Sequence, residues 1–324
     1  MQGRNKAAGY VLSAILLTAM IWPAHAAYPD KAIRIICAYA PGSGSDILIR
    51  YFARKLEPLA GQPVIVENRP GANGAVGTLA AAAARPDGHT VFIISTSTLA
   101  ANPLTSSEIK YVAERDFMPV SPLFLIGSVI AVSAKSDVHN LKELTESLRR
   151  KGKDANYSIT TTTAIGVTAL YFEREKLKDA VRVNYKSNPD AATELAAGNL
   201  DFSVLDVTLG VCRANAGQLR LVAATTADRA ISAPSLPTVK EQGYDDLVFE
   251  SNWSAFLPAG APEEARDKLN RWFNEILALP ETKEFLAPNG AQVLPGDPAK
   301  LAAILKDDIA MWNRVAKLVN LKQD

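Results

Sequence analysis

The sequence predicts an α/β fold with two lobes, each a mainly parallel sheet flanked by helices, and two extended crossover segments. Three observations support this prediction. Short apolar runs alternate with helix-like stretches from Ala32 onward, which is the pattern of parallel β/α units. Two long apolar stretches, Met118 to Ser133 and Val248 to Leu257, show no helix signal. The 298 residues after Ala26 also exceed one ordinary domain.

The chain begins with a segment typical of an export signal. Arg4 and Lys6 precede a largely apolar stretch of eleven residues from Val11 to Ile21, and Ala24-His25-Ala26 has the small residues of a signal peptidase site. A membrane anchor is the alternative, but a spanning helix needs about 20 apolar residues. We therefore expect residues 1–26 to be a signal peptide that is cleaved near Ala26, so that the mature protein is exported.

The β/α pattern then gives a series of elements. The expected strands are Ile33–Ala38, Pro63–Glu67, Thr90–Ser95, Tyr157–Thr160, Val181–Tyr185, Phe202–Leu205 and Leu219–Ala223. The expected helices are Ile47–Ala60, Ala75–Ala84, Leu141–Arg150, Val167–Leu177, Ala191–Ala197 and Leu209–Ala214. Asn140 with Glu143 predicts a capping box, and Gly152 predicts the end of the same helix.

The two extended stretches suggest how the chain is divided. If the chain leaves lobe 1 along the first stretch and returns along the second, lobe 1 comprises residues 27–124 and 250–324, and lobe 2 residues 125–249. Further helices are expected at Glu263–Leu279, Glu281–Leu286 and Pro298–Val319. Apolar residues of the last helix recur at i, i+3 and i+4 spacing, which predicts packing onto lobe 1, and Trp312 and Trp272 are expected in the core.

Charge and cysteine content exclude several classes of function. Without Arg4 and Lys6, 33 of the 35 basic residues remain against 34 acidic ones, and no basic block exists, so nucleic acid is not an expected partner. Cys37 and Cys212 are expected to be buried free thiols, although a disulfide between them stays open. No metal site is expected, because C-x-x-C and H-x-x-x-H spacings are absent.

The segment from Tyr39 to Asp46, YAPGSGSD, lies between an expected strand and an expected helix and is the strongest candidate binding loop. A Walker loop needs a lysine, a dinucleotide loop needs a third glycine where Ile47 stands, and a serine hydrolase elbow needs G-x-S-x-G. His89 and His139, the histidines outside the signal peptide, adjoin turn residues and are expected at the surface or in turns. We therefore predict no catalytic residue.

The backbone chemistry of this loop favours a carboxylate ligand. The first amides of a helix have no intrahelical partner, and the helix dipole favours negative charge there. The glycines allow close approach of a ligand, and the serines add hydroxyl donors. The candidate ligand-binding residues are Tyr39, Pro41, Gly42, Ser43, Gly44, Ser45 and Asp46. Asp46 would repel a diphosphate, and it either contacts the ligand or is the N-cap of the helix from Ile47.

Three further segments are candidates for the rest of the site. Thr161, Thr162 and Thr163 precede a helix in the other half of the chain, although threonine also favours a continued strand. Thr96 and Ser97 follow the third expected strand, and Asp206 follows Phe202–Leu205. Loops from both lobes would face one another across a cleft.

Several motifs resemble one family. Tyr28-Pro29 with the strand from Ile33, the loop Ala40 to Asp46, and the run Glu67-Asn68-Arg69-Pro70-Gly71-Ala72 resemble the tripartite tricarboxylate transporter substrate-binding proteins, also called Bug proteins. The resemblance continues through Gly198 to Phe202, Leu236 to Val239 and Leu257 to Pro262. It covers essentially all of the chain after the signal peptide.

The resemblance implies a periplasmic binding protein with a type II-like, two-lobed fold. Such a protein closes on a small carboxylate-bearing metabolite and delivers it to membrane permease subunits, here as a monomer without a cofactor. In the family, two loops hold one ligand carboxylate, and by position these are Pro41 to Asp46 and Thr160 to Thr163. The second loop departs from the family, because Thr162-Thr163-Ala164-Ile165 replaces the usual Ser-Gly and His-Leu pairs.

Two other functions stay open. A sensor subunit would use the same fold to engage a receptor kinase instead of a permease. An exported serine hydrolase would use Ser43 or Ser45. The ligand itself, a short aliphatic or an aromatic acid, also stays open, and Tyr39 would offer an apolar wall to either.

Overall fold

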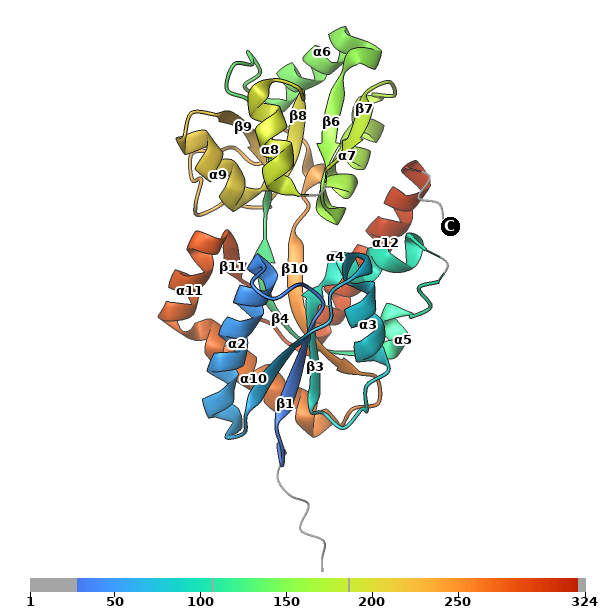
Figure 1. The fold of residues 1–324 in the computed structure, drawn as a ribbon, viewed down its shortest axis with the longest axis vertical. Helices are drawn as coiled ribbons and strands as arrows, with labels where there is room; N and C mark the ends of the chain where they lie inside the picture. The colour runs from blue at the N-terminus through green and yellow to red at the C-terminus, as the bar shows by residue number, and fades with distance from the viewer. Residues whose placement is uncertain (1–27, 107, 186, 320–324) are drawn as a thin grey trace, which may run out of the picture.

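The computed structural model describes residues 28–106, 108–185 and 187–319, and it places two sheets one above the other along the long axis (Figure 1). The expected signal peptide, residues 1–26, lies outside the described residues. Among the described helices, none combines the length and the apolar character needed to cross a membrane.

Lobe 1, as we use the term, is the six-stranded sheet with the helices around it. Its strand order is β11-β4-β10-β3-β1-β2. The strands are β1 (Ile33–Cys37), β2 (Val64–Asn68), β3 (Thr90–Ser95), β4 (Phe117–Ile126), β10 (Ser251–Pro258) and β11 (Ala291–Val293). The helices are α2 (Gly44–Ala60), α3 (Ala75–Ala82), α4 (Thr96–Ala101), α5 (Ala113–Asp116), α10 (Glu263–Ala278), α11 (Pro280–Leu286) and α12 (Pro298–Leu318).

Lobe 2 is the five-stranded sheet with its helices, and its strand order is β7-β6-β8-β5-β9. The strands are β5 (Ser128–Ser133), β6 (Asn156–Ile159), β7 (Val181–Asn184), β8 (Phe202–Asp206) and β9 (Leu219–Ala224). The helices are α6 (Leu141–Lys151), α7 (Thr162–Glu175), α8 (Asn188–Ala197) and α9 (Val207–Asn215). Short 3-10 turns lie at Ala72–Gly74, Asn102–Leu104, Gly152–Asp154, Asp245–Leu247 and Ala287–Asn289.

The predicted α/β fold with two lobes is confirmed, but both sheets are mixed rather than mainly parallel. The strands of the β/α units are parallel: β1 pairs with β2 and β3, and β6 pairs with β7 and β8. The strands at the crossings are antiparallel to their neighbours, as β10 is to β3 and β5 is to β8. A segment that arrives from the other lobe enters its sheet without a crossover helix, so it is free to run antiparallel.

The first expected extended stretch, Met118 to Ser133, forms two strands that belong to different sheets. β4 belongs to lobe 1 and β5 to lobe 2, and only Gly127 separates them. A Cβ atom at Gly127 would overlap the methyl group of Thr226, so the chain passes between the lobes at a point that only glycine fits. β10 returns antiparallel to β4, and the upper ends of both strands point toward lobe 2 in Figure 1.

Several helices begin earlier than predicted, because hydroxyl groups cap them. Ser43 is the N-cap of α2, and its Oγ accepts from the N–H of Asp46 at 3.3 Å. Thr161 is the N-cap of α7, and its Oγ1 accepts from the N–H of Ala164 at 3.2 Å. The N-cap of α6 is confirmed, with Asn140 Oδ1 accepting from the N–H of Glu143 at 2.9 Å, while the Glu143 side chain accepts from the N–H of His139 at 2.7 Å rather than from that of Asn140.

Helix α12 does not pack onto lobe 1 alone, which corrects the prediction. Leu301 and Leu305 lie in a lobe 1 core cluster, but Trp312 and Val315 lie in the main core cluster of lobe 2. The ring of Trp312 meets that of Phe249 edge to face, with centroids 5.9 Å apart. Figure 1 shows α12 rising past α4 toward α7. The helix therefore joins the two lobes.

The predicted burial of two tryptophans and two cysteines is confirmed for one residue of each pair. Trp312 is fully buried as expected, whereas Trp272 is only half-buried. Cys37 and Cys212 are both free, and Cys37 is buried, but Cys212 is exposed and lines the cavity described below. The prediction of two buried thiols is therefore wrong for Cys212.

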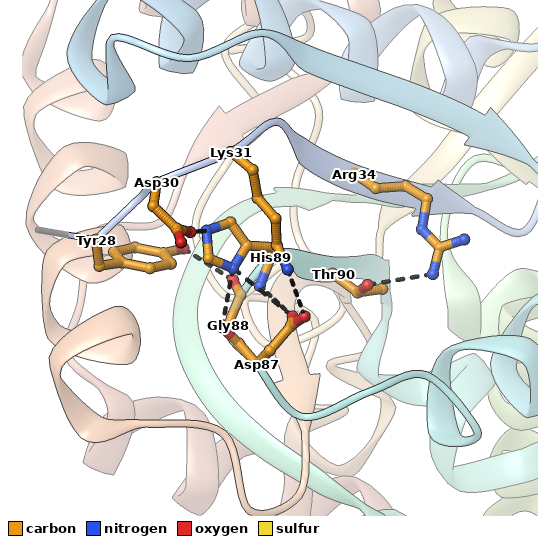
Figure 2. A network of polar contacts seen from close by, with 8 residues as sticks. All are labelled: Tyr28, Asp30, Lys31, Arg34, Asp87, Gly88, His89 and Thr90. Atoms are coloured by element: carbon orange, nitrogen blue, oxygen red, sulfur yellow. Dashed lines mark hydrogen bonds and ion pairs between the residues drawn. The ribbon is translucent and has the colours of Figure 1, made fainter. Parts of the chain in front are cut away.

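His89 was expected at the surface or in a turn; it directly follows the bend at Asp87 and Gly88, but it is buried, so the surface position is wrong. It sits just before β3, where its Nε2 lies 3.0 Å from Asp30 Oδ1 and its Nδ1 lies 2.9 Å from the carbonyl oxygen of Asp87 (Figure 2). The Tyr28 hydroxyl donates to the carbonyl oxygen of Gly88 at 2.8 Å, and the Tyr28 ring packs on the imidazole with ring centroids 4.9 Å apart. This network ties the first described residues to the amino-terminal ends of β1 and β3.

Candidate functional site

A cavity of about 660 Å³ lies between the lobes, at the carboxyl-terminal ends of β1, β3 and β8. Ligands of open α/β sheets bind at this end of the strands. Lobe 1 contributes Tyr39, Gly44, Ser45, Leu48, Asn73, Ser95, Ser97, Thr98, Ile126, Ser251, Trp253 and Asn289. Lobe 2 contributes Ser128, Thr160, Thr161, Thr162, Thr163, Asp206, Thr208, Leu209 and Cys212. Hydroxyl groups dominate this lining.

The amino terminus of α2 opens onto the cavity through Gly44 and Ser45. The turn before it depends on Gly42, whose φ of 77° is rarely adopted by other residues. The first N–H groups of a helix lack acceptors within it, and the dipole makes this end favourable for an anion. Ser45 adds a half-buried hydroxyl at the same place.

Asp46 lies behind this loop and is not among the residues that line the cavity. Its Oδ2 accepts from the N–H of Gly42 and from Arg50 Nε, both at 2.8 Å, and its Oδ1 accepts from Asn68 Nδ2 at 2.8 Å. Burial alone would raise the pKa of Asp46, but these hydrogen bonds, led by that from Arg50, bring it below its usual value. Asp46 is therefore not the N-cap of α2. It lies in the first turn of that helix, and its hydrogen bonds fix the preceding turn at Gly42 to the helix and to Asn68.

An aromatic pair forms one wall of the cavity. The rings of Tyr39 and Trp253 lie 5.3 Å apart at an angle of 47°, and Trp253 is only 5% exposed. Burial raises the pKa of Tyr39 to about 12, so its hydroxyl stays protonated near neutral pH. Leu48 and Ile126 extend this apolar surface.

The amino terminus of α7 faces the cavity from lobe 2. Thr161 caps this helix, and Thr162 and Thr163 are its first two residues rather than part of a loop. Asn73 Nδ2 donates to Thr162 Oγ1 at 3.1 Å, which links α7 to lobe 1 across the cavity mouth. Both lobes therefore offer a helix amino terminus with hydroxyl groups to one space.

The stretch from Ser95 to Thr98 is the end of β3 and the start of α4, not a loop. Ser97 lines the cavity, and its Oγ lies 3.4 Å from Asp308 Oδ2 of α12, to which it donates. Thr96 instead turns its Oγ1 to the carbonyl oxygen of Asn252 at 3.1 Å and does not line the cavity. Burial raises the pKa of Asp308 to about 6.

Asp206 is the last residue of β8 and precedes α9, with its side chain exposed to the cavity. Its Oδ2 accepts from Asn188 Nδ2 at 2.5 Å. The Asn188 Oδ1 in turn accepts from the hydroxyl of Thr160, which fixes the orientation of the amide. The surrounding protein desolvates Asp206 and raises its pKa, although the bond from Asn188 opposes this.

The structure brings most, but not all, of the sequence-predicted site residues to the cavity. Tyr39, Gly44, Ser45, Ser97, Thr161, Thr162, Thr163 and Asp206 line it, whereas Pro41, Gly42, Ser43, Asp46 and Thr96 do not. Sequence reasoning missed Asn73, Trp253 and Asn289 as residues of the cavity. Asn73 directly precedes Gly74, and this Asn-Gly pair, a turn signal, was what the sequence offered; the structure gives Asn73 a φ of 50°.

The cavity has little charge of its own. Among the described residues that line it, none is Lys, Arg or His, and Asp206 is the one carboxylate. No group of three or more His, Cys, Asp or Glu residues in the described part of the chain is placed to hold a metal ion. The cavity is thus arranged for hydrogen bonding from hydroxyl and amide groups.

Sequence comparisons show which family of proteins this chain is similar to. Residues 48–321 match the model of the family described as tripartite tricarboxylate transporter family receptor. The chain is 33% identical over 318 residues to a UPF0065 protein of Bordetella bronchiseptica, covering 96% of this chain and 93% of that protein. It is 28% identical to protein BugT of Bordetella pertussis over 300 residues, with 91% of each covered.

Solved structures share the fold. The periplasmic binding protein BugD superposes with a TM-score of 0.75 at 24% identity, over 92% of this chain and 100% of that one. The R. palustris protein Rpa4515, solved with adipate, gives a TM-score of 0.77 at 24% identity, over 90% of this chain and 98% of that one.

Proposed function

The chain belongs to the tripartite tricarboxylate transporter receptor family, and from this premise we propose that it captures one small carboxylate-bearing metabolite between its lobes and delivers it to the membrane subunits of a transporter. Proteins of this family are periplasmic solute-binding receptors and not enzymes. The serine hydrolase alternative is therefore wrong.

The observation that carries the proposal is the meeting of two helix amino termini at one cavity. α2 and α7 come from different lobes, and each presents hydroxyl groups beside its first turn. Each terminus carries roughly half a positive charge, so the pair offsets about one carboxylate. A ligand carboxylate between them would bind without a basic side chain. The adipate bound by Rpa4515 is a ligand of this chemical class.

We further propose that the lobes move about the two crossings, at Gly127 and just before β10. Ligand contacts from both lobes form only when the cleft is closed, so binding shifts the population toward the closed form. The transporter would recognise that form. Ser45, Thr161, Thr162 and Thr163 are the residues we assign to the carboxylate, with Tyr39 and Trp253 against the body of the ligand.

A thermal-shift screen of the purified mature protein tests the proposal. The panel contains aliphatic monocarboxylates, dicarboxylates, aromatic acids and amino acids. A ligand at 100 times its dissociation constant should add about 2.7 kcal/mol of stability. Ser45→Ala should reduce the shift, while Ser232→Ala, an exposed hydroxyl outside this cavity, should leave it unchanged. No shift with any carboxylate would overturn the proposal.

A further inference from the structure

Resting on the proposed function, we infer that Asn73 is a positioning residue that acts through Thr162. Its side-chain amide holds the two lobes together at the mouth of the cavity and leaves the Thr162 hydroxyl hydrogen free to donate to the ligand carboxylate. The hydrogen bonds of Asn73 and the backbone conformation that presents it carry this inference.

The hydrogen bond from Asn73 to Thr162 spans the cleft between the lobes. Among the described residues that line the cavity, it is the one side-chain hydrogen bond that joins the two lobes, with Asn73 Nδ2 3.1 Å from Thr162 Oγ1. Asn73 belongs to the turn before α3 in lobe 1, and Thr162 is the first residue of α7 in lobe 2. This bond breaks when the lobes move apart, so its free energy favours the closed cleft.

The neighbouring Asn102 fixes which atom of the Asn73 amide faces Thr162. Asn102 Nδ2 donates to the main-chain carbonyl oxygen of Asn73 at 3.1 Å, and that oxygen can only accept. Asn102 Oδ1 is therefore the atom turned to the Asn73 side chain, 3.4 Å from Nδ2, where it requires a donor. Because Asn102 is buried, its amide cannot turn toward solvent instead. The Nδ2 atom of Asn73 thus lies between Asn102 and Thr162.

This orientation decides what the Thr162 hydroxyl can do. A hydroxyl group has one hydrogen to donate and two lone pairs that accept. Since Asn73 donates to Thr162 Oγ1, the hydroxyl hydrogen is not used in this bond, and it is not donated to another of the described residues. The hydroxyl of Ser97, which also lines the cavity, instead donates to Asp308. Thr162 therefore has a hydrogen to offer to a carboxylate, which accepts only.

The backbone that carries Asn73 is strained. All four residues from Gly71 to Gly74 have positive φ, with 45° at Ala72 and 50° at Asn73. Residues other than glycine adopt this conformation at a cost in free energy, and such residues gather at ligand-binding and switch segments. The turn presents one amide to Asn102 and Thr162 together. Backbone geometry alone would favour glycine at position 73, so the asparagine side chain points to a role at the mouth of the cavity.

Calorimetric titration of Asn73→Gly tests the inference. The probes are hexanoate, adipate, benzoate and glutamate, one from each class of the thermal-shift panel. The dissociation constant should rise about fivefold, the value of one neutral hydrogen bond. Unfolding in urea should stay close to that of wild type, because relief of the strained φ offsets the lost bond. Ala72→Gly makes the same kind of backbone change at an exposed neighbour and keeps the amide, so it should bind like wild type.

A double-mutant cycle with Thr162→Val measures whether Asn73 acts through Thr162. Valine removes the hydroxyl, so Asn73→Gly should then change the dissociation constant by less than about twofold. Asn73→Asp keeps the shape of the side chain but offers only acceptors. The Thr162 hydrogen would then point to the new carboxylate, and binding should be weaker than in Asn73→Gly. Circular dichroism verifies that each variant is folded.

The outcomes separate this inference from the proposed function. If Asn73→Gly binds as tightly as wild type, or weakens binding equally with and without the Thr162 hydroxyl, the inference is wrong and carboxylate capture stands. The same holds if Ala72→Gly loses as much affinity as Asn73→Gly. If neither these probes nor the other carboxylates of the thermal-shift panel bind the wild-type protein, both are overturned.

Discussion

At the scale of single residues, Ser43 and Ser45 stand two positions apart at the start of α2 and have different roles. The Ser43 hydroxyl caps α2 and the Ser45 hydroxyl faces the cavity. Ser43→Ala should lower the free energy of unfolding by about 1 kcal/mol, the usual cost of losing an N-cap. Ser45→Ala should leave stability unchanged and weaken ligand binding by about 1 kcal/mol, the value of one neutral hydrogen bond.

Urea unfolding and calorimetric titration of the two variants separate these effects. The assignment fails if Ser45→Ala destabilises the protein while Ser43→Ala weakens binding without loss of stability.

Asp308 gives a pH-dependent prediction. Burial raises its pKa to about 6, although the hydrogen bond from Ser97 lowers it in part. A carboxyl group whose pKa is raised on folding stabilises the protein fully below the unfolded pKa of about 4 and loses that contribution as pH rises through about 6. Asp308→Asn removes the charge. The variant should therefore be about 1 to 3 kcal/mol more stable than wild type at pH 8, and the two proteins should have nearly equal stability at pH 4.

Unfolding free energies measured from pH 4 to pH 8 test this. Asp307→Asn, next to Asp308 but exposed, should show no such pH trend. If the difference in unfolding free energy between wild type and Asp308→Asn does not increase between pH 4 and pH 7, the account is contradicted.

The sequence predicted which hydroxyl residues precede helices, but not which of them face the ligand. Capping and anion binding demand the same residue types, because both satisfy the first N–H groups of a helix. The N-cap is the residue whose hydroxyl accepts from the backbone N–H three residues later. Ser43 does this with the N–H of Asp46, and so Ser43 rather than Ser45 caps the helix. Trp253 and Asn289 come from distant parts of the chain, and only the fold brings them to the cavity.

At the scale of elements, α12 is the helix that joins the lobes. Trp312 is fully buried and packs on Phe249, so Trp312→Ala should lower the free energy of unfolding by about 3 to 5 kcal/mol. Asn313→Ala, an exposed change one position along the same helix, should cost little. Chemical denaturation measures both. Equal and small effects of the two variants would contradict the packing of α12 into lobe 2.

Periodicity predicted that α12 exists and which of its faces is apolar, and both are confirmed. It did not predict that the first half of that face meets one lobe and the second half the other, because periodicity carries no information about the partner surface. The same limit applies to the sheets. Apolar runs predicted the strands, but the direction of a strand depends on how the chain enters the sheet. β4 and β5 lie on either side of Gly127, and each runs antiparallel to its neighbours in its own sheet.

At the scale of the whole molecule, a closing motion is expected on binding. Small-angle X-ray scattering with and without a ligand from the thermal-shift screen should show a smaller radius of gyration in the bound state, because contacts from both lobes favour the closed form. Ser232→Ala, with the cavity intact, should contract like wild type. A radius of gyration that is unchanged at saturating ligand would mean that capture proceeds without closure.

The central claim is that one ligand carboxylate lies between the amino termini of α2 and α7, and a crystal structure of the complex tests it most directly. We predict that the carboxylate oxygens lie within hydrogen-bonding distance of the Gly44 to Ser45 segment on one side and of the Thr161 to Thr163 segment on the other. A carboxylate bound outside the cavity, or inside it but against the apolar wall of Tyr39 and Trp253, would contradict the claim.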